Sequence, residues 1–164
     1  MDLVLDPPRG VAPLRLGMTL DEAVAAVSGW GEPRVLRRPG RNSAKVSASL
    51  DGVGVQALLE GGPAVTAVEL WWPGEGRESA TRVLLHGDDV FRTPAVELFR
   101  RAALRGRPVD TSRPEHPVIP GVSLGFTRQT SQEVPRDAGG LPVYVTSVHV
   151  GGRDYYDHLR ADRG

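Results

Sequence analysis

The chain has 164 residues, and its 20 Lys and Arg residues balance its 20 Asp and Glu residues. A net charge of zero provides no overall field that would attract nucleic acid or an anionic membrane. The absence of cysteine excludes disulfide bonds, thiolate catalysis and cysteine metal sites. A hydrophobic fraction of 40% is enough to form a buried core, so we expect one folded domain over residues 1–164.

The N-terminal segment predicts a cytoplasmic protein that begins with an extended lead-in. Residues 1–10 have neither the basic start nor the long apolar run of a secretory signal. No apolar run approaches the roughly 20 residues that span a bilayer, so we expect no membrane partner. Pro7, Pro8 and Pro13 favour an extended, non-helical conformation for residues 1–13.

The clearest predicted element is an amphipathic helix that begins after Thr19. Thr19 and Glu22 have the spacing of a capping box, in which each side chain satisfies a backbone amide of the first turn. An apolar stripe at i, i+3, i+4 and i+7 follows, formed by Leu20, Ala23, Val24 and Val27. Gly29 or Gly31 can supply the left-handed residue that ends the helix.

An arginine-rich turn is predicted over 34–41, and three strands of an antiparallel meander follow it. The strands are expected at 45–50, 53–60 and 64–72. Asp51-Gly52 and Gly61-Gly62 separate them and are typical of hairpin turns. Residues 73–78 form a polar connector to the second half of the chain.

The second half is expected to contain a strand at 83–85, a helix, and two further strands. Thr93 can cap the helix, with Pro94 at its first position and Gly106 at its end. Its buried side is expected to consist of Val96, Phe99 and Ala103. A proline-rich irregular segment, two strands and a charged tail follow, over 107–120, 122–128, 142–150 and 153–164.

Several short matches recur in the same order in both halves of the chain. Thr19 and Thr93 are separated by the same distance in sequence as Ser49-Leu50 and Ser123-Leu124. The strand segment beginning at Val65 also resembles the one beginning at Val145. These matches predict an α+β fold built as a pseudo-duplicated unit, in which one helix is followed by an antiparallel meander and the helices pack on the sheet. The two repeats would span 10–73 and 83–152.

The segment LRLGMT from Leu14 to Thr19, together with Glu22-Ala23-Val24, resembles a helix opening found in two families. These are the beta-lactamase inhibitory protein and the outer-membrane small protein A families. The resemblance implies a short helical segment packed on an antiparallel sheet and a role in binding another protein. Its local physics is simple, because Gly17 permits an unusual backbone angle and Thr19 caps the helix.

Two short patterns suggest chemistry, but neither has a complete set of partners. Residues 121–125 fit the G-x-S-x-G pattern, whose serine mechanism requires a helix directly after it, whereas a strand is expected here. His86, Asp88 and Asp89 cluster an imidazole with two carboxylates, but Gly and Asp are also typical of turns. We therefore expect no catalytic residues, no metal and no cofactor.

The remaining candidates favour a partner-binding surface. Adjacent strand residues point to opposite faces, so one of Trp71 and Trp72 should face outward, as should His149. Exposed tryptophan near arginine is typical of protein-binding hot spots. The candidate partner-binding residues are Trp30, Trp71, Trp72, Arg37, Arg38 and His149.

These observations predict a non-catalytic protein-binding domain of the inhibitor or immunity-protein kind. The alternative is a small-molecule binder or small enzyme that uses a groove between helix and sheet, with His86 and Asp88 converging in it. Nucleic-acid binding is a weaker third hypothesis. It would use the arginine clusters at 34–41 and 100–107, each of which follows a predicted helix or lies at its end.

Overall fold

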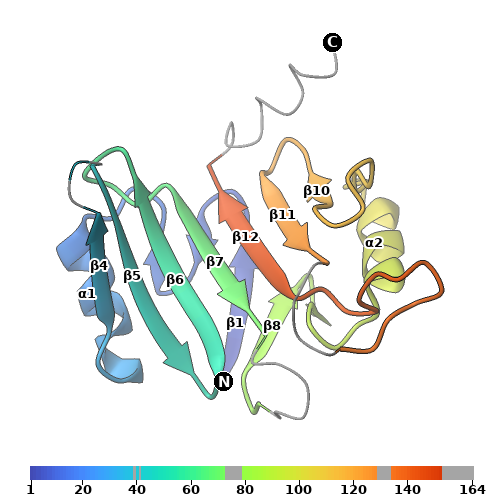
Figure 1. Ribbon diagram of the computed structural model, residues 1–164, viewed down its shortest axis with the longest axis horizontal. Coiled ribbons are helices and arrows are strands. Elements are labelled where there is room, and N and C mark those ends of the chain that lie inside the picture. Colours follow the sequence, from blue (N-terminus) through green and yellow to red (C-terminus); the bar gives the residue numbers. More distant parts are fainter. Residues whose placement is uncertain (39, 41, 73–78, 129–133, 153–164) are drawn as a thin grey trace.

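The fold is mostly β and consists of a seven-stranded sheet, a five-stranded sheet and two α-helices within the residues described (Figure 1). The structure is a computed structural model that describes residues 1–38, 40, 42–72, 79–128 and 134–152. The predicted connector at 73–78 and the charged tail at 153–164 lie outside the described residues.

The large sheet is antiparallel throughout and combines strands from both halves of the chain. Its order is β10-β11-β12-β7-β6-β5-β4. The strands are β4 (Arg34–Arg38), β5 (Ser43–Leu50), β6 (Val53–Glu60), β7 (Ala67–Trp71), β10 (Val118–Ile119), β11 (Leu124–Thr127) and β12 (Ser147–Gly151). The late strand β12 lies directly beside β7, with Val148 opposite Leu70.

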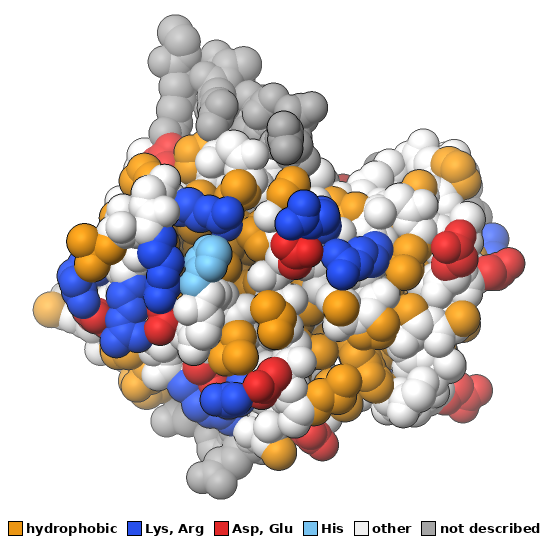
Figure 2. All heavy atoms as spheres, turned by 180° about the vertical axis from the view of Figure 1, so that it is seen from behind, with side chains coloured by type: hydrophobic (Ala, Val, Ile, Leu, Met, Phe, Trp, Pro, Cys, Tyr) orange, Lys and Arg blue, Asp and Glu red, His pale blue; other side chains and the backbone are white. Residues whose placement is uncertain are grey.

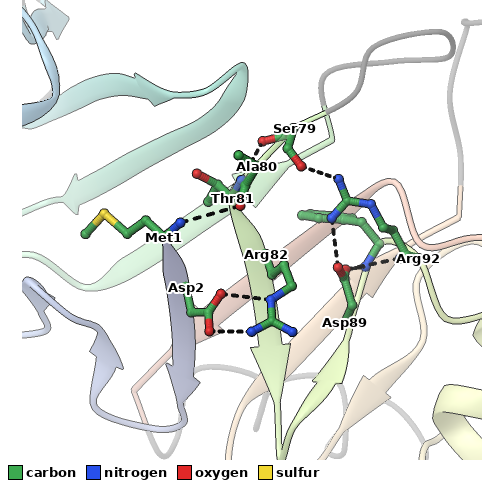
Figure 3. A network of polar contacts seen from close by, with 9 residues as sticks. Met1, Asp2, Ser79, Ala80, Thr81, Arg82, Asp89 and Arg92 are labelled. Atoms are coloured by element: carbon green, nitrogen blue, oxygen red, sulfur yellow. Dashed lines mark hydrogen bonds and ion pairs between the residues drawn. The ribbon is translucent and has the colours of Figure 1, made fainter.

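The small sheet has the order β3-β2-β1-β8-β9 and contains one parallel pair, β1 with β8. Its strands are β1 (Asp2–Asp6), β2 (Gly10–Val11), β3 (Leu14–Arg15), β8 (Arg82–Leu85) and β9 (Asp88–Asp89). One ion pair joins β1 to β8, and a second lies next to it at β9 (Figure 3). Asp2 accepts two hydrogen bonds from the Arg82 guanidinium, at 2.9 and 2.7 Å. Asp89 accepts one from the Arg92 guanidinium, at 2.9 Å, and one from the Arg92 amide, at 3.2 Å.

The first helix begins where its capping sequence predicts, with the Thr19 half of the capping box formed and the Glu22 carboxylate on the Thr19 hydroxyl instead of a backbone amide. Helix α1 (Leu20–Val27) continues into a short 3-10 turn, η1 (Ser28–Trp30). The Thr19 hydroxyl accepts from the Glu22 amide at 3.2 Å and donates to the Glu22 carboxylate at 3.1 Å. Gly31, at φ 128°, follows the turn, so one of the two glycines expected to end the helix does so.

The second helix, α2 (Ala95–Leu104), differs from its prediction in the face that it buries. Pro94, not Thr93, occupies the capping position, and no side chain caps the helix. The buried side chains are Ala95, Leu98 and Ala102. Of the predicted face, Phe99 packs against the core, whereas Val96 is 69% exposed and Ala103 is exposed. The predicted and the observed sets of residues are both apolar and both have helical spacing. Packing against the sheet, and not the sequence of the helix, therefore determines which set is buried.

One core lies against a single face of the large sheet, which we call the inner face. Helix α1, the small sheet and helix α2 cover the inner face in that order (Figure 1). Leu70 and Val148 point into this core from the large sheet, and Leu3 and Val11 meet them from the small sheet. Phe99 of α2 contacts Phe126 of β11, with ring centroids 5.2 Å apart.

The expected pseudo-duplicated α+β unit is wrong. The predicted lead-in at 1–13 is part of the small sheet, because it forms β1 and β2. Its strand β1 pairs with β8 of the second half of the chain. The strands after α2 form no second meander of their own but extend the first sheet beyond β7. The matched serines also differ, since Ser49 lies within β5 and Ser123 lies in a turn at φ 51°.

Most strands of the first half occur close to their predicted positions. Strand β6 has the predicted bounds, and β5 and β7 are shifted at their ends. The arginine-rich segment at 34–41 is the exception, because residues 34–38 form β4 and not a turn. No helix in the described part of the chain is long and apolar enough to cross a membrane.

Candidate protein-binding face

The candidate site is the face of the large sheet that points away from the core, which we call the outer face. The register aligns its side chains across the strands, so Lys45 lies opposite Leu58, and Ser47 lies in line with Gln56, Glu69 and His149. No described helix or strand lies over this face (Figure 1). The outer face therefore presents half-exposed side chains of mixed chemistry across five strands.

A shallow groove of about 570 Å³ crosses the outer face near β4. Leu36 and Leu58 supply its apolar part, and Arg38, Lys45, Glu60 and Glu69 supply its charges. The Thr66 hydroxyl donates to the Glu60 carboxylate at 3.0 Å, and the Ser47 hydroxyl donates to Gln56 Oε1 at 3.3 Å. The remaining lining residues are Asn42, Ser43, Ala44, Gln56, Leu59 and Gly61.

Two titratable groups of this face are shifted because they are partly buried. Burial raises the pKa of Glu69, with a further raising effect from Glu60 and an opposing one from Lys45. Burial lowers the pKa of His149, and the Glu60 carboxylate opposes that shift. Both shifts disfavour the charged form of the side chain, and burial is the largest cause of each.

The pKa shift of His149 predicts a pH-dependent stability. An imidazole whose pKa is lower in the folded than in the unfolded state favours folding only while it is neutral. As the pH falls below 6.5, wild-type protein should therefore lose unfolding free energy relative to His149→Gln. Urea titrations of both proteins at pH 7.5 and pH 5 measure the difference. An NMR titration midpoint of His149 at or above 6.5 would contradict the prediction.

Trp71 lies on the outer face and packs over a glycine of the neighbouring strand. Gly54 is the register partner of Trp71, and a Cβ placed on Gly54 would overlap the indole ring. The absence of a side chain at Gly54 therefore permits the ring to lie against the sheet. Trp71 is partly exposed there, so its ring forms part of the surface and not of the core.

Trp72 faces the opposite way, as expected for the next residue along a strand. Its ring centroid is 5.7 Å from that of Phe91, and the Arg92 guanidinium lies 5.0 Å from the centre of the ring. Trp72 also packs against the core, as does Trp30 at the end of η1. The structure therefore places Trp71 on the outer face and the other two tryptophans away from it.

The remaining predicted site residues are divided between the two faces. Register places Arg38 on the outer side, where it lines the groove, and His149 lies on the same face beside Glu69. Arg37 points to the inner side and lines a second cavity next to α1. Strands β5 and β6 separate Trp71 from β4, so Trp71 and the β4 arginines are not neighbours.

His86 and Asp88 do not form a metal site in the structure. Asp88 receives hydrogen bonds from Arg101 at 2.6 Å and from Arg105 at 3.0 Å. Burial lowers the pKa of His86, and Arg107 and Arg105 lower it further. Among the residues described, no three His, Asp or Glu side chains are grouped so as to hold a metal ion.

The G-x-S-x-G segment lacks the geometry of a serine nucleophile. Ser123 is buried in a turn, and strand β11 follows it where the mechanism requires a helix.

The arginines of α2 are paired with carboxylates. Arg100 and Arg101 contact Glu97 at 2.5 and 3.0 Å and lower the pKa of its carboxyl to about 2. Figure 2 shows the molecule from behind, and basic and acidic side chains lie next to one another on the surface seen there. Such paired charge is unlike the uninterrupted basic surface that nucleic acid requires.

No protein-family model, curated protein sequence or solved structure matches this chain. Its function therefore has to be inferred from its own residues and their arrangement.

The central residues of the outer face could not be identified from the sequence alone. Lys45, Leu58 and Glu69 lie in the predicted strands, and the alternation of each strand assigns them to the side opposite the buried valines. The missing information was the register between strands, which brings the three side chains to one place.

Proposed function

We propose that the chain is a non-catalytic protein-binding domain, of the inhibitor or immunity-protein kind, that contacts its partner through the outer face. The observation that supports the proposal is an uncovered sheet face that combines Trp71 and Leu58 with Lys45, Glu60 and Glu69. Protein interfaces typically have aromatic and aliphatic side chains at the centre and polar ones at the rim.

The shape of the outer face also favours a macromolecular partner. Its side chains are contributed by adjacent strands, and its groove is shallow and bounded on one side by the sheet edge. Sites for small molecules usually enclose most of the ligand surface. A sheet face of this shape instead suits a partner that covers it from above.

A second candidate function is supported by the cavity next to α1. This cavity has a volume of about 620 Å³ and lies between the first turn of α1 and the β4–β5 hairpin. Asp21, Arg37 and Arg38 supply its charged groups. Its volume, like that of the outer-face groove, is within the range of small-molecule sites, and the second candidate function places a small ligand here.

Substitution of Trp71 tests the proposed function. The partner is first isolated by affinity purification from cells that produce the protein and is identified by mass spectrometry. We expect Trp71→Ala to weaken the complex about tenfold or more, since a buried tryptophan anchor contributes on the order of 1.4 kcal/mol or more to binding. Gly54→Ala, which retains the tryptophan but displaces its ring, should also weaken the complex.

Val4→Ala is the matched control, because Val4 is exposed on the small sheet, away from the outer face. Calorimetric dissociation constants should be the same for Val4→Ala and wild type. Weakening by Val4→Ala without weakening by Trp71→Ala would contradict the assignment of the binding face. If no stoichiometric protein partner is found, the proposal fails, and a thermal-shift screen of small ligands against Asp21→Ala protein tests the second candidate.

A further inference from the structure

Strand β4 is the one terminal strand longer than two residues in the sheets that the structure describes. The terminal strands β3, β9 and β10 have two residues each, whereas β4 has five. The side of β10 that faces away from β11 is occupied by the chain at Asp110, because Asp110 and Val118 exchange backbone hydrogen bonds of 2.7 and 3.1 Å. No described strand borders the free side of β4. Its free side is thus a place where a further strand can be added.

The hairpin next to β4 determines which of its backbone groups point outward. Asp51 and Gly52, both at positive φ, form a two-residue turn, so the flanking pair Leu50 and Val53 is hydrogen-bonded. Bonding alternates along an antiparallel ladder, and the odd-numbered residues of β5 therefore bond to β4. Ser43, Lys45 and Ser47 are opposite Arg38, Leu36 and Arg34. It follows that Val35 and Arg37 direct their N–H and C=O groups away from the sheet.

The side chains of β4 give its edge a positive charge. Arg34, Arg37 and Arg38 are exposed, and none of them forms an ion pair with a carboxylate of the described residues, unlike the arginines of β8 and α2. Between them, Val35 is 41% exposed and Leu36 is 59% exposed. The edge therefore combines unpaired backbone groups with two exposed aliphatic side chains and three available cations.

We propose that β4 is the docking strand for an acidic, extended segment of the partner protein, which adds to the large sheet as an antiparallel or parallel neighbour of β4. Addition of a strand to a sheet edge is a recurrent mode of peptide recognition. Charge complementarity selects the occupant, since a second copy of this chain would place its β4 arginines against the same three arginines. The inference rests on the proposed function, because the segment belongs to the protein that covers the outer face.

Proline at position 35 tests the backbone contribution. Val35→Pro removes one outward N–H group that the β4–β5 ladder does not use, and edge strands tolerate proline. Val35→Thr is the matched control, because it retains the N–H group and the branched shape. We expect Val35→Pro to weaken binding of the purified partner about tenfold and Val35→Thr to change it less than about twofold. Unfolding curves of both variants show whether the fold is retained.

A synthetic probe tests the charge preference independently of the partner. The probe is an eight-residue peptide that alternates glutamate with valine, compared with the same peptide containing lysine in place of glutamate. We expect the acidic peptide alone to bind, to bind more weakly as salt increases, and to protect the Val35 and Arg37 amides from hydrogen exchange. Arg34→Glu should weaken its binding up to about fivefold, and Arg113→Glu, at an exposed arginine elsewhere, should not.

The experiments on β4 and on the outer face can fail independently, so the docking-strand proposal and the proposed function are tested separately. Equal binding of the acidic and basic peptides, or full partner affinity in Val35→Pro, would overturn the proposal that β4 is a docking strand. If Trp71→Ala still weakens the partner complex in that case, the outer face remains the binding face. Binding of the acidic peptide at β4 together with no partner at the outer face would overturn the proposed function and leave the edge assignment in place.

Discussion

Leu70→Ala is expected to lower the free energy of unfolding by about 3 kcal/mol. Leu70 is fully buried on β7, at the place where the inner face of the large sheet meets the small sheet. Removing three carbon atoms there loses their burial and leaves a cavity that surrounding β-strands cannot easily close. Urea or thermal unfolding of the purified variant measures the loss.

Leu58→Ala is the matched control for this prediction, because it makes the same change on the outer face of the adjacent strand. Leu58 is only partly buried there, so the expected loss is under about 1.5 kcal/mol. A loss for Leu58→Ala equal to that for Leu70→Ala would show that the outer face is covered in the free protein. That result would contradict the division into inner and outer faces.

Arg128→Met is expected to cost about 2–4 kcal/mol of unfolding free energy. The Arg128 side chain is 8% exposed and donates to the Pro142 carbonyl at 3.0 and 2.8 Å and to Asp137 at 3.1 Å. Methionine retains much of the side-chain volume but leaves this buried carbonyl without a donor and Asp137 without its cation. The loss matters for the sheet because these contacts hold the chain that leads into β12.

Arg136→Met provides the comparison for Arg128→Met, since Arg136 is an exposed arginine of the same segment. Its guanidinium donates to the Gly140 carbonyl at 2.9 Å, in contact with solvent. We expect its loss to cost less than about 1 kcal/mol. Equal losses in the two variants, measured by urea unfolding, would indicate that Arg128 is not buried in solution.

The elements that the sequence predicts well are those determined by neighbouring residues. Thr19 and Glu22 specify the start of α1, and Asp51-Gly52 specifies the β5–β6 hairpin with its register. Alternation also places Trp71 and Trp72 on opposite faces. Each of these signals is contained within a few residues, so no knowledge of the rest of the chain is required.

The sheet order could not be predicted, because it depends on pairings between distant segments. Residues 1–13 contain prolines and look like a lead-in, yet β1 is the central strand of the small sheet and pairs in parallel with β8. Regular spacing of Ser49 and Ser123 suggested a duplication, but spacing along the chain does not specify which strands pair. Long-range pairing has no local sequence signature.

The candidate site was only partly predictable for the same reason. The sequence predicts a turn for Arg34 and Arg37, because an edge strand exposed on both sides lacks the apolar alternation of a buried strand. His149 and Trp71 could be assigned to a strand face, but not to the same face as Lys45 and Glu69. Placing them together requires the register across β5, β6, β7 and β12.

Site-specific photo-crosslinking tests the central claim, that the outer face binds a protein, most directly. A photo-reactive phenylalanine replaces Leu58 on the outer face or Val4 on the small sheet, and the protein is irradiated in cells that normally produce it. The claim predicts that one protein is crosslinked in high yield from position 58 and that it is absent from position 4. Crosslinking from position 4 alone, or from neither position, would contradict the claim.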